Sequence, residues 1–262
     1  MKQKIFNPGF DIQPKFSPLG FEYGKDCFGP KVENRKLDTI RPSLLDQNCD
    51  GPEIVYSIAM DVGKQIHRNL LNSMHLLYGA VTYAAGRLGE EPIRSQGHIH
   101  KTSQYAQGWS TPEVYEIWTG KAVIYMQESA NDDPRRCFAV YASPGDVVIV
   151  PPGWAHATIS ADPGMPLSFG AWCNRDYGFE YDLVRKHKGL AWYPLLEGDQ
   201  LKWKNNSRYT NQQLIEKTPE MYEGLGLSPG IPIYTQFETN PQIFSFVPKP
   251  KLKEELWRSY VP

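Results

Sequence analysis

Three histidines and one glutamate are the residues of this chain whose types and spacing best fit chemistry. His98 and His100 stand in Gly97-His98-Ile99-His100, Glu113 follows in the segment from 111 to 115, and His156 ends the segment from 144 to 156. Three imidazoles and one carboxylate form a donor set for a first-row divalent metal with positions left open for substrate. The set therefore predicts metal-assisted chemistry.

Strand geometry provides a way to bring these four side chains together. Residues two apart on a strand share a face, so His98 and His100 would point into one interior while Ile99 points away. Gly97 lets the backbone lie close to a ligand, and the turn before His156 fixes the direction of the strand that carries it. Two strands meeting across a barrel would then deliver all four donors to one point.

The middle of the chain has the pattern of an all-β sandwich or barrel. Short runs rich in β-forming residues alternate with turn residues. These predicted strands are 79–83, 114–118, 122–126, 137–141, 147–150, 157–159 and 167–169.

The segments before and after this region lack the regular alternation of short strands and turns, so the chain divides into three parts. We expect an extended N-terminal arm over residues 1–53, a barrel over 54–189 and a C-terminal extension with short helices over 190–262. The spacing of Val62, Ile66, Leu70, Met74 and Leu77 predicts a helix with one buried face. Within the extension we expect helices over 211–225 and 251–260 and a strand over 231–237.

Composition narrows the function classes. The chain has 262 residues, 40% of them hydrophobic, and a net charge of −1. Its mixed charges argue against a nucleic-acid partner, and no apolar run reaches the length of a bilayer span. The first 18 residues lack the apolar stretch of a signal peptide, and the four cysteines are scattered without a CxxC spacing. We therefore expect a cytoplasmic protein with no membrane partner.

The second histidine segment resembles the second motif of the cupin superfamily, G-x5-P-x-G-x2-H-x3-N. Gly145, Pro151, Gly153 and His156 fall on it, whereas Ser160 stands in place of the Asn. In the first cupin motif, six residues separate the Glu from a Gly. Glu113 and Gly120 have that spacing, which favours Glu113 over Glu116 as a ligand. An insertion over residues 102–110, at the barrel mouth, would explain the long gap after His100.

Within the cupins, the chain is similar to the metal-dependent glucose-6-phosphate isomerases of archaeal type. The matching words are Gly86–Pro92, Gly97–His100, Glu113–Tyr115, Val150–His156 and Asp176–Gly178, over roughly residues 56–189. The resemblance implies an all-β cupin barrel, or jelly roll, and an intramolecular oxidoreductase that interconverts glucose 6-phosphate and fructose 6-phosphate in glycolysis and gluconeogenesis. It also implies a homodimer.

The resemblance assigns roles residue by residue. It implies that His98, His100, Glu113 and His156 bind one divalent metal, with Fe²⁺ or Mn²⁺ preferred and Zn²⁺ or Ni²⁺ possible. It implies a substrate site that contains Thr82, Ser95, Gly97, Tyr115, Trp172 and Tyr177. Trp172 replaces a family Tyr and loses its hydroxyl. The expected sugar-phosphate site raises a problem, because strand alternation would place Ser95 and Gly97 on the opposite face of the strand from His98. A bulge or bend before Gly97 would resolve it.

Two routes for hydrogen between C1 and C2 stay open. Glu113 is the best candidate for a base that shuttles a proton through an enediol, and Tyr115 is the second candidate catalytic residue. Alternatively, hydrogen moves as a hydride while the metal organises both oxygens. Two other functions also stay open: a cupin enzyme acting on a different sugar or sugar phosphate, and a non-catalytic sugar-binding cupin.

Overall fold

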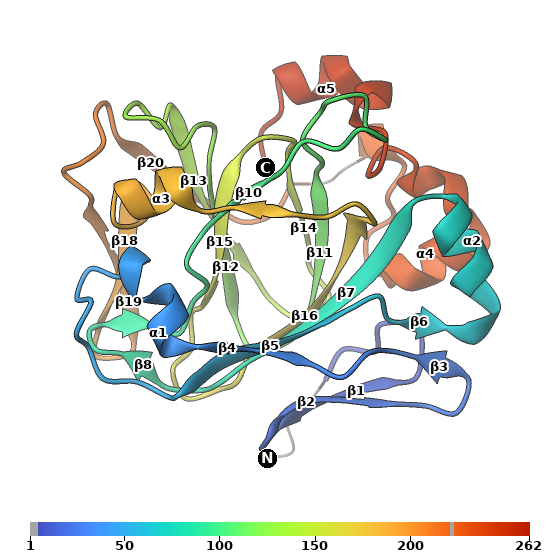
Figure 1. The fold of residues 1–262 in the computed structure, drawn as a ribbon, viewed down its shortest axis with the longest axis horizontal. Coiled ribbons are helices and arrows are strands. Elements are labelled where there is room, and N and C mark those ends of the chain that lie inside the picture. Colours follow the sequence, from blue (N-terminus) through green and yellow to red (C-terminus); the bar gives the residue numbers. More distant parts are fainter. Residues whose placement is uncertain (1–4, 221–222) are drawn as a thin grey trace.

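Two β-sheets packed face to face form the centre of the computed structural model, which describes residues 5–220 and 223–262 (Figure 1). The larger sheet has six strands. Their order is β14 (Val147–Val150), β11 (Glu113–Thr119), β16 (Ser168–Asn174), β7 (Leu76–Tyr83), β5 (Ile54–Met60) and β4 (Glu33–Lys36). The smaller sheet has the order β15 (Ala155–Ser160), β12 (Ala122–Gln127), β13 (Arg136–Ala142) and β20 (Gln213–Lys217).

Five two-stranded elements and several short helices surround these sheets. The hairpins and bridges pair β1 (Ile12–Phe16) with β2 (Leu19–Tyr23), β3 (Cys27–Phe28) with β6 (Gly63–Lys64), β8 (Arg87–Leu88) with β9 (Glu91–Pro92), β10 (Ile99–His100) with β17 (Phe179–Glu180), and β18 (Trp192–Glu197) with β19 (Gln200–Asn205). The α-helices are α1 (Leu37–Ile40), α2 (Arg68–Ser73), α3 (Asp182–Lys186), α4 (Ile233–Thr239) and α5 (Glu254–Arg258). Short 3₁₀ turns are η1 (Arg41–Ser43), η2 (Gln65–His67), η3 (Glu223–Leu225), η4 (Pro241–Phe244) and η5 (Pro250–Lys253).

The core has an inner layer and two outer layers. The inner layer lies between the two sheets and includes Tyr115, Met126 and Phe169. The outer face of the six-stranded sheet is covered by the N-terminal arm and by the C-terminal segment, which packs Phe237 and Phe244 on Trp172. An outer cluster that includes Val123, Tyr125 and Ala157 covers the outer face of the smaller sheet. Burial of apolar surface on both faces of the larger sheet is the main stabilising contribution.

The barrel confirms the all-β cupin prediction. Each predicted strand of the middle region falls within a strand or overlaps one. Between β11 and β12, Gly120 adopts a φ of +77°, and a Cβ there would lie 2.8 Å from the carbonyl oxygen of Pro166. Only glycine fits such a turn without strain.

Three predictions of local structure are wrong, wholly or in part. The helix expected over 62–77 is an α-helix only from Arg68 to Ser73, and its expected buried residues Ile66 and Leu70 are exposed. It stops because His75 takes a φ of +55° just before β7 begins.

The other two errors lie in the C-terminal extension. Residues 213–217 form a strand rather than a helix, because they pair in parallel with the edge of β13; Met221 and Tyr222 of that predicted helix lie outside the described residues. Residues 233–239 form α4 rather than a strand. The predicted helix over 251–260 is present over 254–258 as α5.

Candidate metal centre

A one-residue bulge sets the direction of the first histidine segment. Arg94 pairs with Ile159, but four residues later His98 pairs with His156, which is only three residues from Ile159. The extra residue falls at Gln96 and Gly97, where Gly97 takes a φ of +87°. The bulge resets the alternation, so Ser95 and His98 line the same pocket. The bend that the sequence required before Gly97 is therefore present.

Backbone pairing holds the two histidine segments together. The N–H of His98 donates to the carbonyl of His156 at 3.0 Å, and the N–H of His156 donates back to His98 at 2.9 Å. His100 belongs to β10, which pairs with β17 through Phe179. Glu113 is the first residue of β11, which belongs to the six-stranded sheet.

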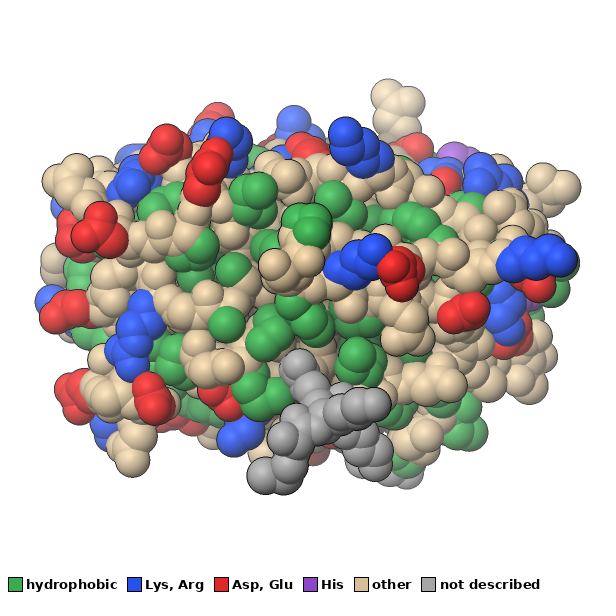
Figure 2. All heavy atoms as spheres, turned by 90° about the horizontal axis from the view of Figure 1, so that it is seen from below, with side chains coloured by type: hydrophobic (Ala, Val, Ile, Leu, Met, Phe, Trp, Pro, Cys, Tyr) green, Lys and Arg blue, Asp and Glu red, His purple; other side chains and the backbone are tan. Residues whose placement is uncertain are grey.

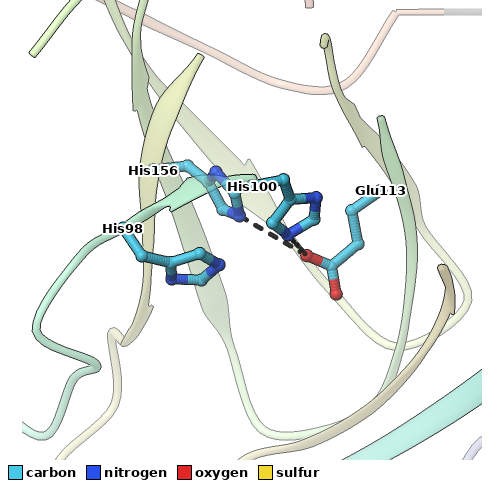
Figure 3. A group of neighbouring side chains, drawn as sticks. All are labelled: His98, His100, Glu113 and His156. Atoms are coloured by element: carbon cyan, nitrogen blue, oxygen red, sulfur yellow. Dashed lines mark ion pairs between the residues drawn. The ribbon is translucent and has the colours of Figure 1, made fainter. Parts of the chain in front are cut away.

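The four predicted ligands converge (Figure 3). One donor atom from each of His98, His100, Glu113 and His156 lies within 4.8 Å of all the others. Oε2 of Glu113 is 3.2 Å from Nε2 of His100 and 3.4 Å from Nε2 of His156. Donors that share one ion at about 2.0–2.2 Å stand roughly 3.0–3.5 Å apart, so this spacing fits a metal centre.

Hydrogen bonds fix the tautomers of two of the imidazoles. Nδ1 of His100 lies 2.9 Å from the carbonyl of Thr111, and Nδ1 of His156 lies 3.1 Å from the carbonyl of Trp154. A carbonyl only accepts, so each Nδ1 carries the proton and a neutral ring presents its Nε2 lone pair to the centre. Among the described residues, the Nε2 atoms of all three histidines lack a hydrogen-bond partner.

The charge states suit a bound cation. Burial by itself would raise the pKa of Glu113, but positive charge on the side of His100 and His156 holds that pKa well below its usual range, and a bound cation would supply this charge when the rings are neutral. Burial, together with the other two imidazoles, holds the pKa of His98 well below the usual histidine value, and burial lowers the pKa of His156. A carboxylate and neutral imidazoles facing one another with their lone pairs repel unless a cation lies between them. The residues present thus fit a divalent metal.

Two side chains hold the Glu113 carboxylate. The Tyr115 hydroxyl donates to Oε2 at 2.8 Å, and the Cys173 thiol donates to Oε1 at 3.3 Å. Both donors come from the inner face of the six-stranded sheet. Cys173 was missed from the sequence, because a lone cysteine in a buried strand carries no sign of a polar partner.

The inserted segment is tied to both motif segments. A bridge between Thr102 and Ser110 closes the insertion as its own loop. The Ser110 hydroxyl donates to the carbonyl of His100 at 2.8 Å and accepts from the N–H of Gly153 at 3.0 Å. The loop thereby helps to position His100.

A pocket opens beside the four ligands. Besides His98 and Glu113, its lining combines aromatic, aliphatic and hydroxyl side chains with one guanidinium. These residues are Arg35, Tyr56, Ile58, Met60, Val81, Tyr83, Ser95, Tyr115, Thr158, Phe169, Phe179 and Tyr181. The predicted site residues Ser95 and Tyr115 are among them.

Three other predicted substrate residues lie elsewhere. Thr82 and Trp172 point to the outer face of the six-stranded sheet, where Thr82 donates to the carbonyl of Lys15 and Trp172 packs on Tyr234. Tyr177 is 46% exposed and does not line the pocket. The prediction of Thr82 and Trp172 as substrate residues is therefore corrected by strand parity. Gly97 contributes through the bulge, with no room for a side chain against Leu190.

Several pocket residues escaped the sequence analysis. Tyr83 and Thr158 occupy strand positions whose direction was unknown, and Phe179 and Tyr181 follow the predicted Asp176–Gly178 word. Arg35 comes from the N-terminal arm, over 60 positions before His98. No local pattern marks such a residue.

Fold and site together define a class: a cupin barrel with a three-histidine, one-glutamate cluster on its inner face. Solved structures with partial likeness include an oxalate oxidase, with a TM-score of 0.33, 14% identity and coverage of 42% of this chain and 47% of that one. A Bacillus subtilis oxalate decarboxylase variant has a TM-score of 0.34 and 16% identity, over 47% and 26% of the two chains.

Sequence comparison identifies the particular family. The family model described as glucose-6-phosphate isomerase (GPI) matches residues 43–212, and the chain belongs to this family. The glucose-6-phosphate isomerase of Thermococcus gammatolerans is 30% identical over 188 residues, covering 70% of this chain and 89% of that protein. That of Pyrococcus horikoshii is 29% identical over 205 residues, covering 74% and 98%.

Proposed function

We propose that this chain is an aldose–ketose isomerase that interconverts glucose 6-phosphate and fructose 6-phosphate at a divalent metal. Family membership supports the reaction, and the convergence of four donors within 4.8 Å is the observation that carries the metal chemistry. When bound, the ion would act as a Lewis acid toward the oxygens on C1 and C2 of the open-chain sugar.

The protein's own residues would orient the substrate and handle its hydrogen. Ser95, Thr158 and the pocket tyrosines offer hydroxyls to the sugar, while Phe169 and Phe179 exclude water. Glu113 and Tyr115 are the candidate catalytic residues. Glu113 accepts one hydrogen bond on each oxygen, and its Oε2 faces the Nε2 atoms of His100 and His156 at the metal centre. This arrangement supports Glu113 first as a ligand and leaves the enediol and hydride routes to experiment.

A coupled assay with fructose 6-phosphate tests the reaction. We expect glucose 6-phosphate to form with saturation kinetics, and mannose 6-phosphate in the same panel would report selectivity. Absence of turnover in metal-replete protein would refute the proposal. Running the reaction in deuterated water then separates the routes, because label in the product requires a solvent-exchanging enediol, whereas a hydride shift retains the original hydrogen.

The identity of the metal is proposed from the resemblance. Three nitrogens and one oxygen suit several first-row ions, and we propose Fe²⁺ or Mn²⁺ ahead of Zn²⁺ or Ni²⁺. Elemental analysis of protein purified without added metal, followed by reconstitution with each ion, would rank them by activity restored.

A cytoplasmic location is proposed on the state of the thiols. All four cysteines lie in the described part of the chain, and each is free and buried. Such thiols are usual in reducing compartments. In residues 5–220 and 223–262, no helix has both the length and the apolar character needed to span a membrane.

A homodimer is proposed from the resemblance. Figure 2 shows the face seen from below in Figure 1, where apolar side chains gather in the middle and charged ones lie mostly toward the rim. A face of this kind is compatible with a second copy. Light scattering at micromolar concentration tests the proposal, and a monomer mass would contradict it.

A further inference from the structure

We propose that Arg35, contributed by the N-terminal arm, binds the phosphate group of the substrate at the mouth of the metal pocket. This inference rests on the proposed function and names the residue that would recognise the charged end of a sugar phosphate. Arg35 lies outside the 43–212 segment that matches the family model.

The fold delivers Arg35 to the pocket through an added edge strand. Strand β4 pairs with β5, placing Arg35 opposite Tyr56, and the pairing shifts register directly after Arg35. Arg35 and its neighbour on β4, Lys36, differ in exposure and in surroundings. The Arg35 side chain is 22% exposed and lines the pocket with His98 and Glu113, whereas Lys36 is 59% exposed and pairs with Glu53 at 2.8 Å.

Charge distinguishes Arg35 from the other pocket residues. Among the described residues that line the pocket, it is the sole lysine or arginine. Glu113 and His98 belong to the metal end of the pocket. A substrate with a carbonyl end and a dianionic phosphate end has complementary partners at the two ends of this pocket.

Two phenol groups, those of Tyr56 and Tyr181, lie close to the guanidinium. Tyr56 and Tyr83 stack at 4.8 Å on neighbouring strands, and Tyr181 approaches from the segment after β17. Burial raises the pKa of Tyr56 and Tyr181, and Arg35 lies near enough to oppose the rise in both. These phenols stay protonated at neutral pH and are donors for phosphate oxygens.

The present partner of Arg35 leaves room for a phosphate. Nη1 contacts Oε1 of Glu33, whose side chain is 67% exposed. Exposed ion pairs contribute little free energy. A guanidinium carries five N–H donors in a planar fork that matches two phosphate oxygens, so one carboxylate contact does not saturate it.

Three variants test the proposal. Arg35→Ala removes the cation, Arg35→Lys keeps the charge without the fork, and Lys36→Ala is the matched control on the same strand. Steady-state kinetics with fructose 6-phosphate are combined with calorimetric binding of fructose 6-phosphate, inorganic phosphate and fructose to chelator-treated protein. Circular dichroism confirms the fold of each variant, and Arg35→Lys serves as the probe if Arg35→Ala does not fold.

We expect Arg35→Ala to raise KM for fructose 6-phosphate at least tenfold, with kcat changed less than KM. Binding of fructose 6-phosphate and of inorganic phosphate to the chelated protein should weaken by a similar factor, whereas any binding of fructose should not change. Arg35→Lys should fall between Arg35→Ala and the wild type, and Lys36→Ala should match the wild type.

Unchanged phosphate affinity in Arg35→Ala, or equal weakening in Lys36→Ala, would overturn the proposal. The same measurements test the proposed isomerase function separately from the phosphate site. A wild-type protein that binds phosphate through Arg35 but does not turn over fructose 6-phosphate would refute the isomerase proposal and leave the anion site intact.

Discussion

At the scale of single residues, the site depends on which nitrogen of each imidazole faces the centre. The carbonyls of Thr111 and Trp154 hold Nδ1 of His100 and His156, so Nε2 points inward. Backbone carbonyls cannot be lost by side-chain substitution, and such outer contacts raise ligand basicity. The ligand geometry is therefore built into the backbone path of both motif segments.

His156→Ala tests the ligand set. The substitution removes one of four donors, so we expect metal content and kcat/KM both to fall by orders of magnitude. His67→Ala, which lies outside the barrel against Tyr234, is the matched control and should retain both. An active, fully metallated His156→Ala protein would remove this residue from the site.

Tyr115→Phe tests the contact that orients the carboxylate. Loss of the 2.8 Å hydrogen bond to Glu113 should lower kcat about 10–100-fold, while most of the metal is retained. Tyr125→Phe is the control, because its hydroxyl makes a comparable contact with Gln127 in the outer cluster. Equal rates in the two variants would argue against a role for Tyr115 beyond packing.

At the scale of elements, a buried carboxylate joins the barrel to the C-terminal extension. Glu116, on the outer face of β11, accepts from the N–H of Ile233 at 2.7 Å and from the indole of Trp118 at 3.3 Å. Burial raises the pKa of Glu116 to about 8. The titratable group that faces Glu116 from β7 is Tyr78, and burial raises the pKa of Tyr78 well above 10. Tyr78 is therefore uncharged near neutral pH, and Glu116, with its own raised pKa, is protonated in the folded protein.

Glu116→Gln tests this junction through the pH dependence of stability. A carboxyl whose pKa is raised on folding stabilises the folded state most below its unfolded pKa of about 4.5, and the contribution is lost as pH rises through about 8. Between pH 5.5 and 8.5 the wild type should lose roughly 2–4 kcal/mol more unfolding free energy than Glu116→Gln.

Urea unfolding of both proteins at these pH values measures the difference. Titration of the histidines is common to the two proteins and cancels in the comparison. The side-chain amide that Glu116→Gln introduces would face the Trp118 N–H and lower stability at every pH, so the slope with pH is the informative quantity. Parallel slopes would show that Glu116 titrates normally.

Burial of the central strands on both faces explains which site residues the sequence could predict. The convergence of His98, His100, Glu113 and His156 could be predicted because H-x-H and the G-x5-P-x-G turn specify residue types and spacing. Thr82 and Trp172 were misplaced because β7 and β16 are buried on both faces. A strand without apolar–polar alternation does not reveal which face points inward.

Distant contacts set the remaining features. The strand at 213–217 forms because the edge of β13 is available to it, and α4 begins at Ile233 against Glu116 of the barrel. Arg35 enters the pocket only because β4 pairs with β5. Each of these depends on a partner far away in the sequence, which local propensity does not encode.

At the scale of the whole molecule, the two terminal segments complete the barrel in different ways. The C-terminal segment covers the outer face of the six-stranded sheet, and Figure 1 shows its helix α4 beside β7. The N-terminal arm adds β4 to the edge of that sheet, next to the pocket. The barrel alone would therefore lack both the cover over Trp172 and the guanidinium of Arg35.

The central claim is that four convergent side chains hold the one metal on which isomerisation depends. Its most direct test is the rate of glucose 6-phosphate formation, measured together with metal content, as a chelator removes the ion and a divalent salt restores it. We expect one equivalent of metal per active chain, with the rate falling and recovering in proportion to occupancy. Full turnover in protein shown to be metal-free would contradict the account.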